Sequence, residues 1–343
     1  MLKDKLKKNA AMGFTQARAL LYTAESLPLP LLNRLLAGEP DRLPTAAEQS
    51  MIIEKARKLL SDDSQDLVDL KLPLSILKTE TTLLQHASRW LQIVGDSAGS
   101  FIRRRQNITT EFSENVKNLD QFPDYYQRNF HHQTDGYLSD ASAHYYEHQV
   151  ELLFRGLADP MRRRLLKPMV NRFRGQKNIK ILEIGCGTGA FTRFLNQALP
   201  DAQVTAIDLS PNYIKKAKSR TVDKGAVDFM VADAQSLPFK DGQYDAVVSV
   251  FLHHELPKQV REEVMIESHR VLKPDGFWGF LDSIQLGDDT DLDFAIVEFP
   301  KTFHEPFFTN YIKSPILDFV SQQWPERLYS QEVHLLSKVV YSQ

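Results

Sequence analysis

The stretch KILEIGCGTGAFTRF, residues 180–194, decides how the rest of the chain is interpreted. Residues 179–184 form a mostly apolar run with one acid, Glu183, which is typical of a buried parallel strand. Three glycines follow within five residues, and glycine permits a tight turn and close approach of a ligand to the backbone. From Ala190 the apolar residues recur at helical spacing. A strand, a glycine turn and a helix N-terminus together predict a pocket of the nucleotide-binding type.

The glycine turn by itself leaves other interpretations open. Gly185, Gly187 and Ala190 satisfy the dinucleotide fingerprint G-x-G-x-x-G/A, which a dehydrogenase would also carry. A turn that merely closes a βα unit is a third interpretation. The segments that follow in the chain distinguish between them.

Further segments have the composition of strands, and helical patterns separate them. They are residues 203–208, 227–232, 244–250, 277–282 and 333–341. A helical pattern over 261–272 is expected to end at the Lys-Pro-Asp-Gly run of 273–276. Strands that alternate with helices indicate a parallel α/β sheet with right-handed crossovers.

Composition narrows the class of protein. The 343 residues suffice for two domains, or for one domain with a long extension. A formal net charge of -2 disfavours nucleic acid as a partner, because such binders usually carry a basic surplus. Cys186 is a single cysteine, so no intrachain disulfide can form, which fits a reducing compartment. We expect a cytoplasmic protein without a signal peptide or transmembrane segment.

The first 118 residues have mainly helical patterns punctuated by prolines. Residues 26–36 are the most apolar piece, expected as a helix docked on a core, with a lid, partner helix or membrane contact as alternatives. Two basic runs, 103–105 and 162–164, are expected to be solvated helix faces, with a phosphate or carboxylate site as the alternative.

Residues 125–146 are dense in tyrosine and histidine, side chains with an apolar body and a polar tip. Ser139 is positioned to cap a helix that follows it. Four histidines lie in or near this stretch: His131, His132, His144 and His148. Since neither a cysteine nor an acid accompanies them at ligand spacing, we expect no metal site.

Five blocks between residues 179 and 282 carry a resemblance to a known family. In order they are ILEIGCGTG, AIDLSP, VADAQSLPF, YDAVVSVFLHHEL and RVLKPDGFWGFLDS. This order and spacing resemble the class I S-adenosylmethionine-dependent methyltransferases of the version often called type 11. The resemblance covers under half of the chain. It implies a Rossmann-like α/β fold, with a mainly parallel seven-stranded sheet and helices on both faces, to which the helical patterns of the first 118 residues add a helical N-terminal region.

We expect three parts of the chain, and the resemblance implies a cofactor for the last of them. The parts are a helical region over 1–120, a connector or lid over 121–175, and a domain over 176–343 that binds S-adenosyl-L-methionine. The residues that the resemblance assigns to this cofactor are Glu183, Gly185, Gly187, Gly189, Asp208, Leu209, Asp233, Ala234 and Val250. By this resemblance Glu183 would meet the ammonium group, Asp208 the ribose hydroxyls, and Asp233 the adenine amino group.

The expected reaction is in-line methyl transfer to a small, apolar or aromatic molecule. If the acceptor must lose a proton, His253 and His254 are the candidate bases, because they directly follow the fourth strand. The residues expected to form a lid and line the acceptor pocket are Phe130, His132, Tyr137, His304 and Tyr311. A non-catalytic cofactor-binding scaffold and a protein methyltransferase are the alternatives.

Overall fold

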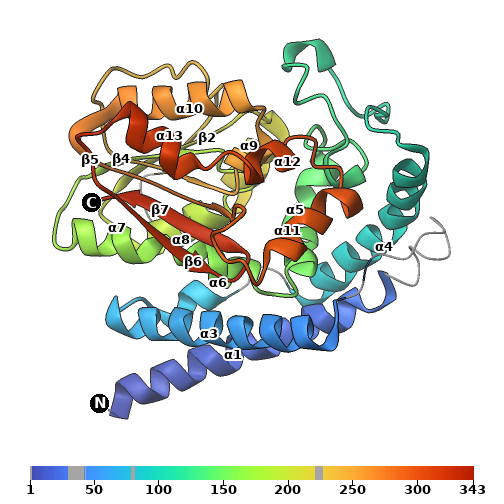
Figure 1. Ribbon diagram of the computed structural model, residues 1–343, viewed down its shortest axis with the longest axis horizontal. Coiled ribbons are helices and arrows are strands. Elements are labelled where there is room, and N and C mark those ends of the chain that lie inside the picture. The colour runs from blue at the N-terminus through green and yellow to red at the C-terminus, as the bar shows by residue number, and fades with distance from the viewer. Residues whose placement is uncertain (1, 30–41, 43, 79–81, 221–226) are drawn as a thin grey trace.

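Seven strands form one sheet in the computed structural model, which describes residues 2–29, 42, 44–78, 82–220 and 227–343. The strands are β1 (Lys180–Ile184), β2 (Gln203–Asp208), β3 (Val227–Val231), β4 (Tyr244–Val250), β5 (Leu272–Ser283), β6 (Tyr329–His334) and β7 (Ser337–Ser342). Their order is β3-β2-β1-β4-β5-β7-β6 (Figure 1). The first five strands are parallel, and β7 is antiparallel to both of its neighbours. The expected Rossmann-like α/β fold with a mainly parallel seven-stranded sheet is confirmed.

Helices cover both faces of this sheet. They are α1 (Leu2–Ser26), α3 (Ala46–Asp69), α4 (Leu83–Gln106), α5 (Asp140–Leu153), α6 (Ala158–Arg163), α7 (Leu166–Phe173), α8 (Ala190–Ala198), α9 (Pro211–Arg220), α10 (Lys258–Val271), α11 (Asp293–Thr302), α12 (Phe308–Ile312) and α13 (Ile316–Gln323). Short 3₁₀ segments are η1 (Leu74–Leu77), η2 (Leu119–Gln121), η3 (Phe130–His132) and η4 (His253–Glu255). Ile181 belongs to a buried cluster with residues of α7 and α8, whereas its neighbour Leu182 belongs to another cluster with residues of α10 to α13. This alternation is the period of two that a strand imposes.

Two sequence predictions about the last strands need correction. Residues 333–341 are not one strand but parts of the β6–β7 hairpin, which turns at Leu335 with a φ of 59°. Residues 273–276 are part of β5 as a bulge, rather than a turn that precedes the strand. Leu272 pairs with Tyr244 and Phe277 pairs with Ala246, so four residues of β5 face one of β4.

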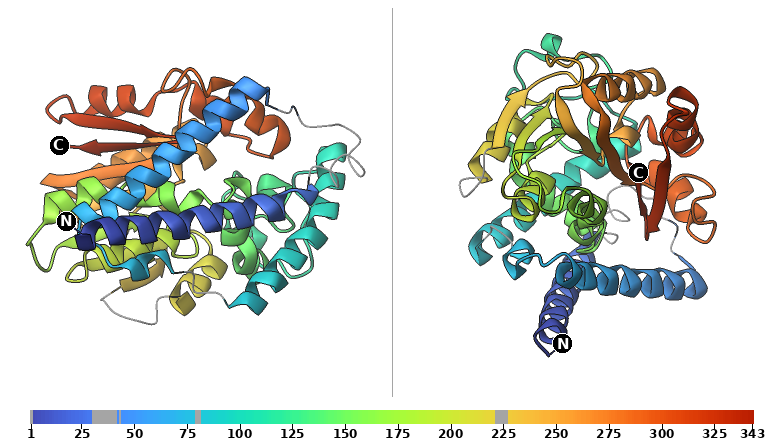
Figure 2. Two further views of the ribbon diagram at one scale, coloured as in Figure 1. Left: turned by 90° about the horizontal axis from the view of Figure 1, so that it is seen from below. Right: turned by 90° about the vertical axis from the view of Figure 1, so that its left-hand side faces the viewer.

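The helices of the N-terminal region pack against the α/β unit. Figures 1 and 2 show α1 and α3 side by side beneath the sheet. Ala11 of α1 and Leu67 of α3 belong to the same buried cluster as Ile181 of β1. Thr45 begins α3 with a capping box in which Glu48 returns the hydrogen bond. Of the apolar stretch 26–36, Ser26 ends α1, whereas residues 30–36 lie outside the described residues.

The expectation that both arginine runs are solvated is wrong for 162–164 and for Arg103, which the packed helices bury, whereas Arg105 is exposed. Arg162, Arg163 and Arg164 are each at most 5% exposed. Arg163 donates two hydrogen bonds to Asp63 of α3, at 2.9 and 2.7 Å. Arg103 of α4 is also buried and donates to the backbone carbonyl of His132, at 3.0 and 2.8 Å. These arginines fasten separate helices to one another.

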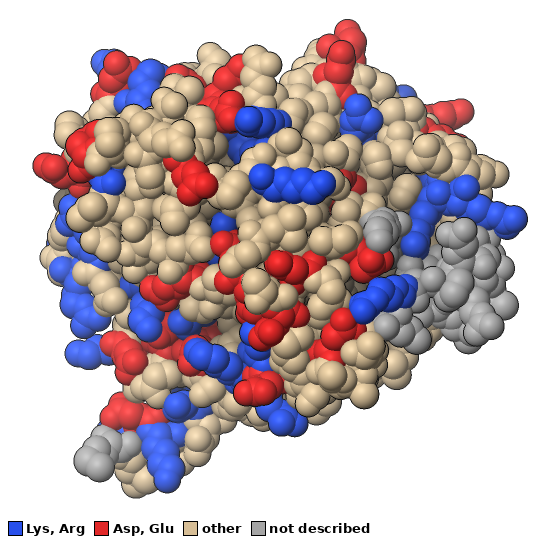
Figure 3. All heavy atoms as spheres, viewed as in Figure 1, with Lys and Arg blue, Asp and Glu red and all other residues tan. Residues whose placement is uncertain are grey.

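The surface carries both signs of charge. On the face drawn in Figure 3, acidic and basic side chains are interspersed, and no continuous basic area is seen among the coloured residues. Within the described part of the chain, no helix combines the length and apolar character needed to cross a membrane.

Candidate functional site

A cavity of about 130 Å³ lies at the carboxyl ends of β1, β2 and β4. Parallel strands end at the same edge of a sheet, so residues far apart in the sequence meet there. The expected cofactor residues that line this cavity are Glu183, Gly185, Gly187, Asp208, Leu209, Asp233, Ala234 and Val250. The structure thus brings together eight of the nine residues that the resemblance assigned to a cofactor.

Two acids at strand ends dominate the chemistry of this cavity. Glu183 of β1 is 1% exposed, and its Oε2 has no hydrogen-bond partner among the described residues. Burial raises the pKa of Glu183 to about 8. Asp208 of β2 accepts hydrogen bonds from the backbone N–H groups of Gly187 at 2.9 Å and Ser210 at 2.8 Å. Burial raises the pKa of Asp208 to about 6, so both acids would be stabilised by a cationic or donor ligand.

The glycine turn combines two different roles. Gly187 has a φ of 56°, and a Cβ added there would meet no atom within 4 Å, so the backbone is open towards a ligand. A Cβ on Gly189 would lie 3.2 Å from the Cβ of Ala217 in α9. Gly189 does not line the cavity. Its missing side chain lets the start of α8 pack closely on α9, which corrects its assignment to the cofactor.

An arginine and a glutamate outside the matching blocks also line this cavity. Arg162 of α6 lies with its Nη1 2.9 Å from Oε2 of Glu147 and 3.2 Å from Oδ1 of Asp159. Glu147 of α5 accepts a hydrogen bond of 2.6 Å from the hydroxyl of Thr188 in the glycine turn. The feature of the sequence that pointed to Arg162 was the basic run 162–164, which was expected to lie on a solvated helix face. Arg162 is buried by helices from other parts of the chain, and the basic run itself does not reveal that these helices pack around it.

Aromatic rings cover the same cavity. Phe130 and Tyr137 both line it, and their rings stack with centroids 4.9 Å apart. Tyr146 of α5 meets Tyr137 edge-on at 5.7 Å. Ser139 caps α5 as expected, by accepting a hydrogen bond of 3.2 Å from the backbone N–H of Ser142. The segment 125–146 therefore lies over the cavity.

A second cavity, of about 60 Å³, adjoins the first and shares Tyr146, Phe251 and Glu255 with it. Most of its wall is apolar: Val150, Leu153, Phe154, Ala295, Ile296, Phe299, Phe308 and Leu336. One end is polar, with His131, His254, Glu255 and Glu305. Such a cavity suits an apolar molecule that has a polar group at one end.

The polar end is a buried network of imidazoles and carboxylates. His131 Nε2 lies 2.6 Å from Oε1 of Glu305 and 3.5 Å from Oε1 of Glu255. Tyr137 donates a hydrogen bond of 2.6 Å to Glu255. Burial lowers the pKa of His131, but the Glu305 and Glu255 carboxylates outweigh burial and raise it to about 10. His131 is therefore an imidazolium at neutral pH. Sequence reasoning singled out neither His131 nor Glu305 for this place, because local patterns do not reveal their proximity.

The two candidate bases on η4 have different surroundings. His254 lines the second cavity, and its Nδ1 lies 2.5 Å from Oδ1 of Asp282. Burial opposes the charged form of His254, but Asp282 outweighs burial and raises the pKa to about 9. His253 lines neither cavity; its Nε2 lies 3.2 Å from the hydroxyl of Ser249 on β4. Burial lowers the pKa of His253 to about 4. The structure therefore separates His253 from the site.

Three expected lid or acceptor residues lie outside both cavities. The rings of His132 and His304 face each other with centroids 5.4 Å apart. Tyr311 donates its hydroxyl proton to the backbone carbonyl of Ser283. The four histidines at 131, 132, 144 and 148 also do not converge, because His131 and His148 belong to different clusters.

Comparisons with known proteins agree with this architecture. Residues 181–276 match the family model described as a methyltransferase domain. A probable phthiotriol/phenolphthiotriol dimycocerosates methyltransferase 2 from Mycobacterium ulcerans is 38% identical over 104 residues, which are 30% of this chain and 39% of that protein. A demethylmenaquinone methyltransferase from Staphylococcus aureus is 35% identical over 125 residues, 36% of this chain and 49% of that protein. The chain therefore spans less than half the length of these relatives.

A solved structure of a SAM dependent methyltransferase from Aquifex aeolicus superimposes with a TM-score of 0.38 and 19% sequence identity. It covers 55% of this chain and 96% of the other. The match to the family model begins at residue 181. The helices α1 and α3 to α7 all end before that residue, so they have no counterpart in the family model.

Proposed function

We propose that this chain, which contains a class I S-adenosylmethionine-dependent methyltransferase domain, transfers a methyl group to a small apolar molecule that carries an ionisable hydroxyl. The observation that carries the proposal is the junction of the two cavities. The cavity with the expected cofactor residues adjoins an apolar cavity whose polar end holds buried carboxylates.

The larger cavity fits S-adenosyl-L-methionine, which when bound supplies an electrophilic methyl group. Glu183 offers its unpartnered Oε2 to the ammonium group, and the open backbone at Gly187 leaves room for the ligand. Asp208 has lone pairs left for the ribose hydroxyls. Arg162 is placed to hold the methionine carboxylate, since a guanidinium binds carboxylates with two parallel hydrogen bonds. Asp233 and Ala234 are left for the adenine edge.

The second cavity defines the acceptor class. Its aliphatic and phenyl lining favours an apolar body, and its polar end requires a group that can donate a proton. The two relatives are named for demethylmenaquinone and for phthiotriol dimycocerosates, and both names are compatible with an apolar acceptor.

The protein would promote transfer by placing a deprotonated oxygen in line with the methyl group and by excluding water. His131 and His254 are cations at neutral pH, so they donate hydrogen bonds to an acceptor oxygen rather than accept its proton. Glu305 is the better proton acceptor: burial raises its pKa, and its Oε2 has no hydrogen-bond partner among the described residues.

Calorimetric titration with S-adenosylmethionine and with its demethylated product tests the cofactor assignment. Asp208→Ala is expected to weaken binding by about 10- to 100-fold, because the ribose hydroxyls lose a charged acceptor. Asp201→Ala, an exposed aspartate before β2, serves as the matched control and should bind as the wild type does. A folded wild-type protein that binds neither compound would overturn the proposal.

The aromatic cover gives a second prediction. Tyr137→Ala is expected to weaken cofactor binding by about 3- to 30-fold, because a cationic sulfonium loses an aromatic face. Tyr137→Phe keeps the ring stacked on Phe130 and loses the hydrogen bond to Glu255, so it should retain most of the affinity. Equal affinities for wild type and Tyr137→Ala would show that the cover does not contact the cofactor.

A further inference from the structure

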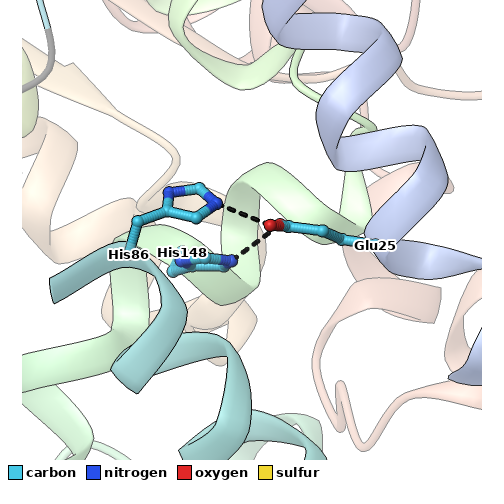
Figure 4. A group of neighbouring side chains, drawn as sticks. All are labelled: Glu25, His86 and His148. Atoms are coloured by element: carbon cyan, nitrogen blue, oxygen red, sulfur yellow. Dashed lines mark hydrogen bonds and ion pairs between the residues drawn. The ribbon is translucent and has the colours of Figure 1, made fainter. Parts of the chain in front are cut away.

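A second group of metal-ligating side chains lies away from both cavities, where three helices meet. Glu25 belongs to α1, His86 to α4 and His148 to α5. Figure 4 shows both imidazoles directed at the carboxylate of Glu25. His86 Nε2 lies 2.6 Å from Oε1 of Glu25, and His148 Nε2 lies 3.0 Å from Oε2.

The geometry of these three groups suits one metal ion. One ligand atom from each residue can be chosen so that all three lie within 4.8 Å of one another. Tetrahedral Zn²⁺ with ligands at about 2.0–2.2 Å places neighbouring ligand atoms about 3.3 Å apart. The observed nitrogen–oxygen distances of 2.6 and 3.0 Å, which are to the two different oxygens of Glu25, would open by about 0.7 and 0.3 Å to admit the ion.

Nearby charges and the donor set determine which ion this site could hold. The guanidinium group of Arg18 lies near His148 and would repel a cation. The charge of Arg18 is largely compensated by its ion pairs with Glu151 at 2.9 Å and Asp159 at 2.5 Å. Two imidazoles and one carboxylate are a donor set typical of Zn²⁺, whereas Mg²⁺ and Ca²⁺ prefer oxygen ligands.

We propose that Glu25, His86 and His148 form a site for Zn²⁺, with water as the fourth ligand. A metal at this point ties α1 and α4 to α5. Because α5 contributes Tyr146 and Glu147 to the cofactor cavity, occupancy would stabilise one wall of that cavity. The site does not depend on the proposed function.

Calorimetric titration of the chelator-treated full chain with ZnCl₂ tests this site. The wild type is expected to bind Zn²⁺, and saturating Zn²⁺ should raise the thermal unfolding midpoint, because the ion binds only the folded arrangement. His86→Gln and His148→Gln are each expected to weaken binding by about 100-fold or more. Glutamine keeps an N–H donor for Glu25, so a purely hydrogen-bonding role would be preserved. His86 is less buried than His148, so His86→Gln tests the site even if His148→Gln does not fold.

Two controls distinguish this site from other histidines. His144→Gln, one helical turn before His148 on α5, should bind Zn²⁺ as the wild type does. Glu305→Gln addresses the other group with metal-ligating atoms, His131, Glu255 and Glu305. Co²⁺ bound in place of Zn²⁺ should show the intense visible bands of tetrahedral coordination, and these should disappear in His86→Gln. The proposal is overturned if the wild type binds no Zn²⁺, or if binding is lost in Glu305→Gln and kept in His86→Gln.

Discussion

Glu305→Gln is expected to lower the rate of methyl transfer by about 10²- to 10⁴-fold, the usual contribution of a general base, while cofactor affinity is retained. The glutamine is nearly the same size, but it cannot take a proton from the acceptor. Glu305 lies in the second cavity and not in the cofactor cavity, so only the chemical step should change. Single-turnover transfer of a labelled methyl group to phenols and hydroquinones with apolar side chains measures the rate. Glu332→Gln, on the edge strand β6, is the matched control.

The pH dependence of the same rate provides a check on the assignment. Burial raises the pKa of Glu305. As the pH rises through this raised pKa, a larger fraction of Glu305 becomes the carboxylate that accepts the proton, so the rate of methyl transfer should rise. His254 loses its proton above a pKa of about 9, so the rate should fall again in the alkaline range. If Glu305→Gln turns over like the wild type, or if it abolishes cofactor binding, the assignment of the proton acceptor is wrong.

Asp63→Asn is expected to lower the free energy of unfolding by about 3–5 kcal/mol, because it leaves Arg163 as a buried charge without its carboxylate. Both side chains are 2% exposed, and the pair has two hydrogen bonds. The pair joins α3 to α6, so its loss weakens the attachment of the N-terminal helices. Urea unfolding followed by circular dichroism measures the change.

The adjacent residue of α3 provides the control for this stability prediction. Asp62 pairs with Lys58 on the surface, at 2.6 Å and with side-chain exposures of 33% and 74%. Because water and salt screen such a pair, Asp62→Asn should change the free energy of unfolding by no more than about 0.5 kcal/mol. If Asp62→Asn and Asp63→Asn lower the free energy of unfolding equally, burial of the Asp63–Arg163 pair makes no special contribution to stability.

The sequence predicted the sheet and the cofactor cavity well for a physical reason. Apolar runs predicted β1 to β4, and parallel strands end at a common edge, where Glu183 and Asp208, both assigned to the cofactor by the resemblance, line one cavity. The resemblance also assigned Gly187 to the cofactor, and Gly187 lines the cavity. It failed for Gly189, because the need for glycine there comes from the proximity of α9. The strand pattern in the sequence also merged β6 and β7 into one predicted strand, because the turn at Leu335 has no glycine or proline to mark it.

What the sequence determined by itself is the local part: the strand, the glycine turn, the helix that follows and the ordered blocks of an α/β fold. Tertiary structure alone decided the rest. Glu305, His131 and Glu255 come from three separate segments, and His254 but not its neighbour His253 faces their cavity. Arg163 is buried because Asp63, 100 residues earlier, provides a countercharge. Side-chain charge and burial depend on partners that are distant in the chain, and periodicity within one segment carries no information about them.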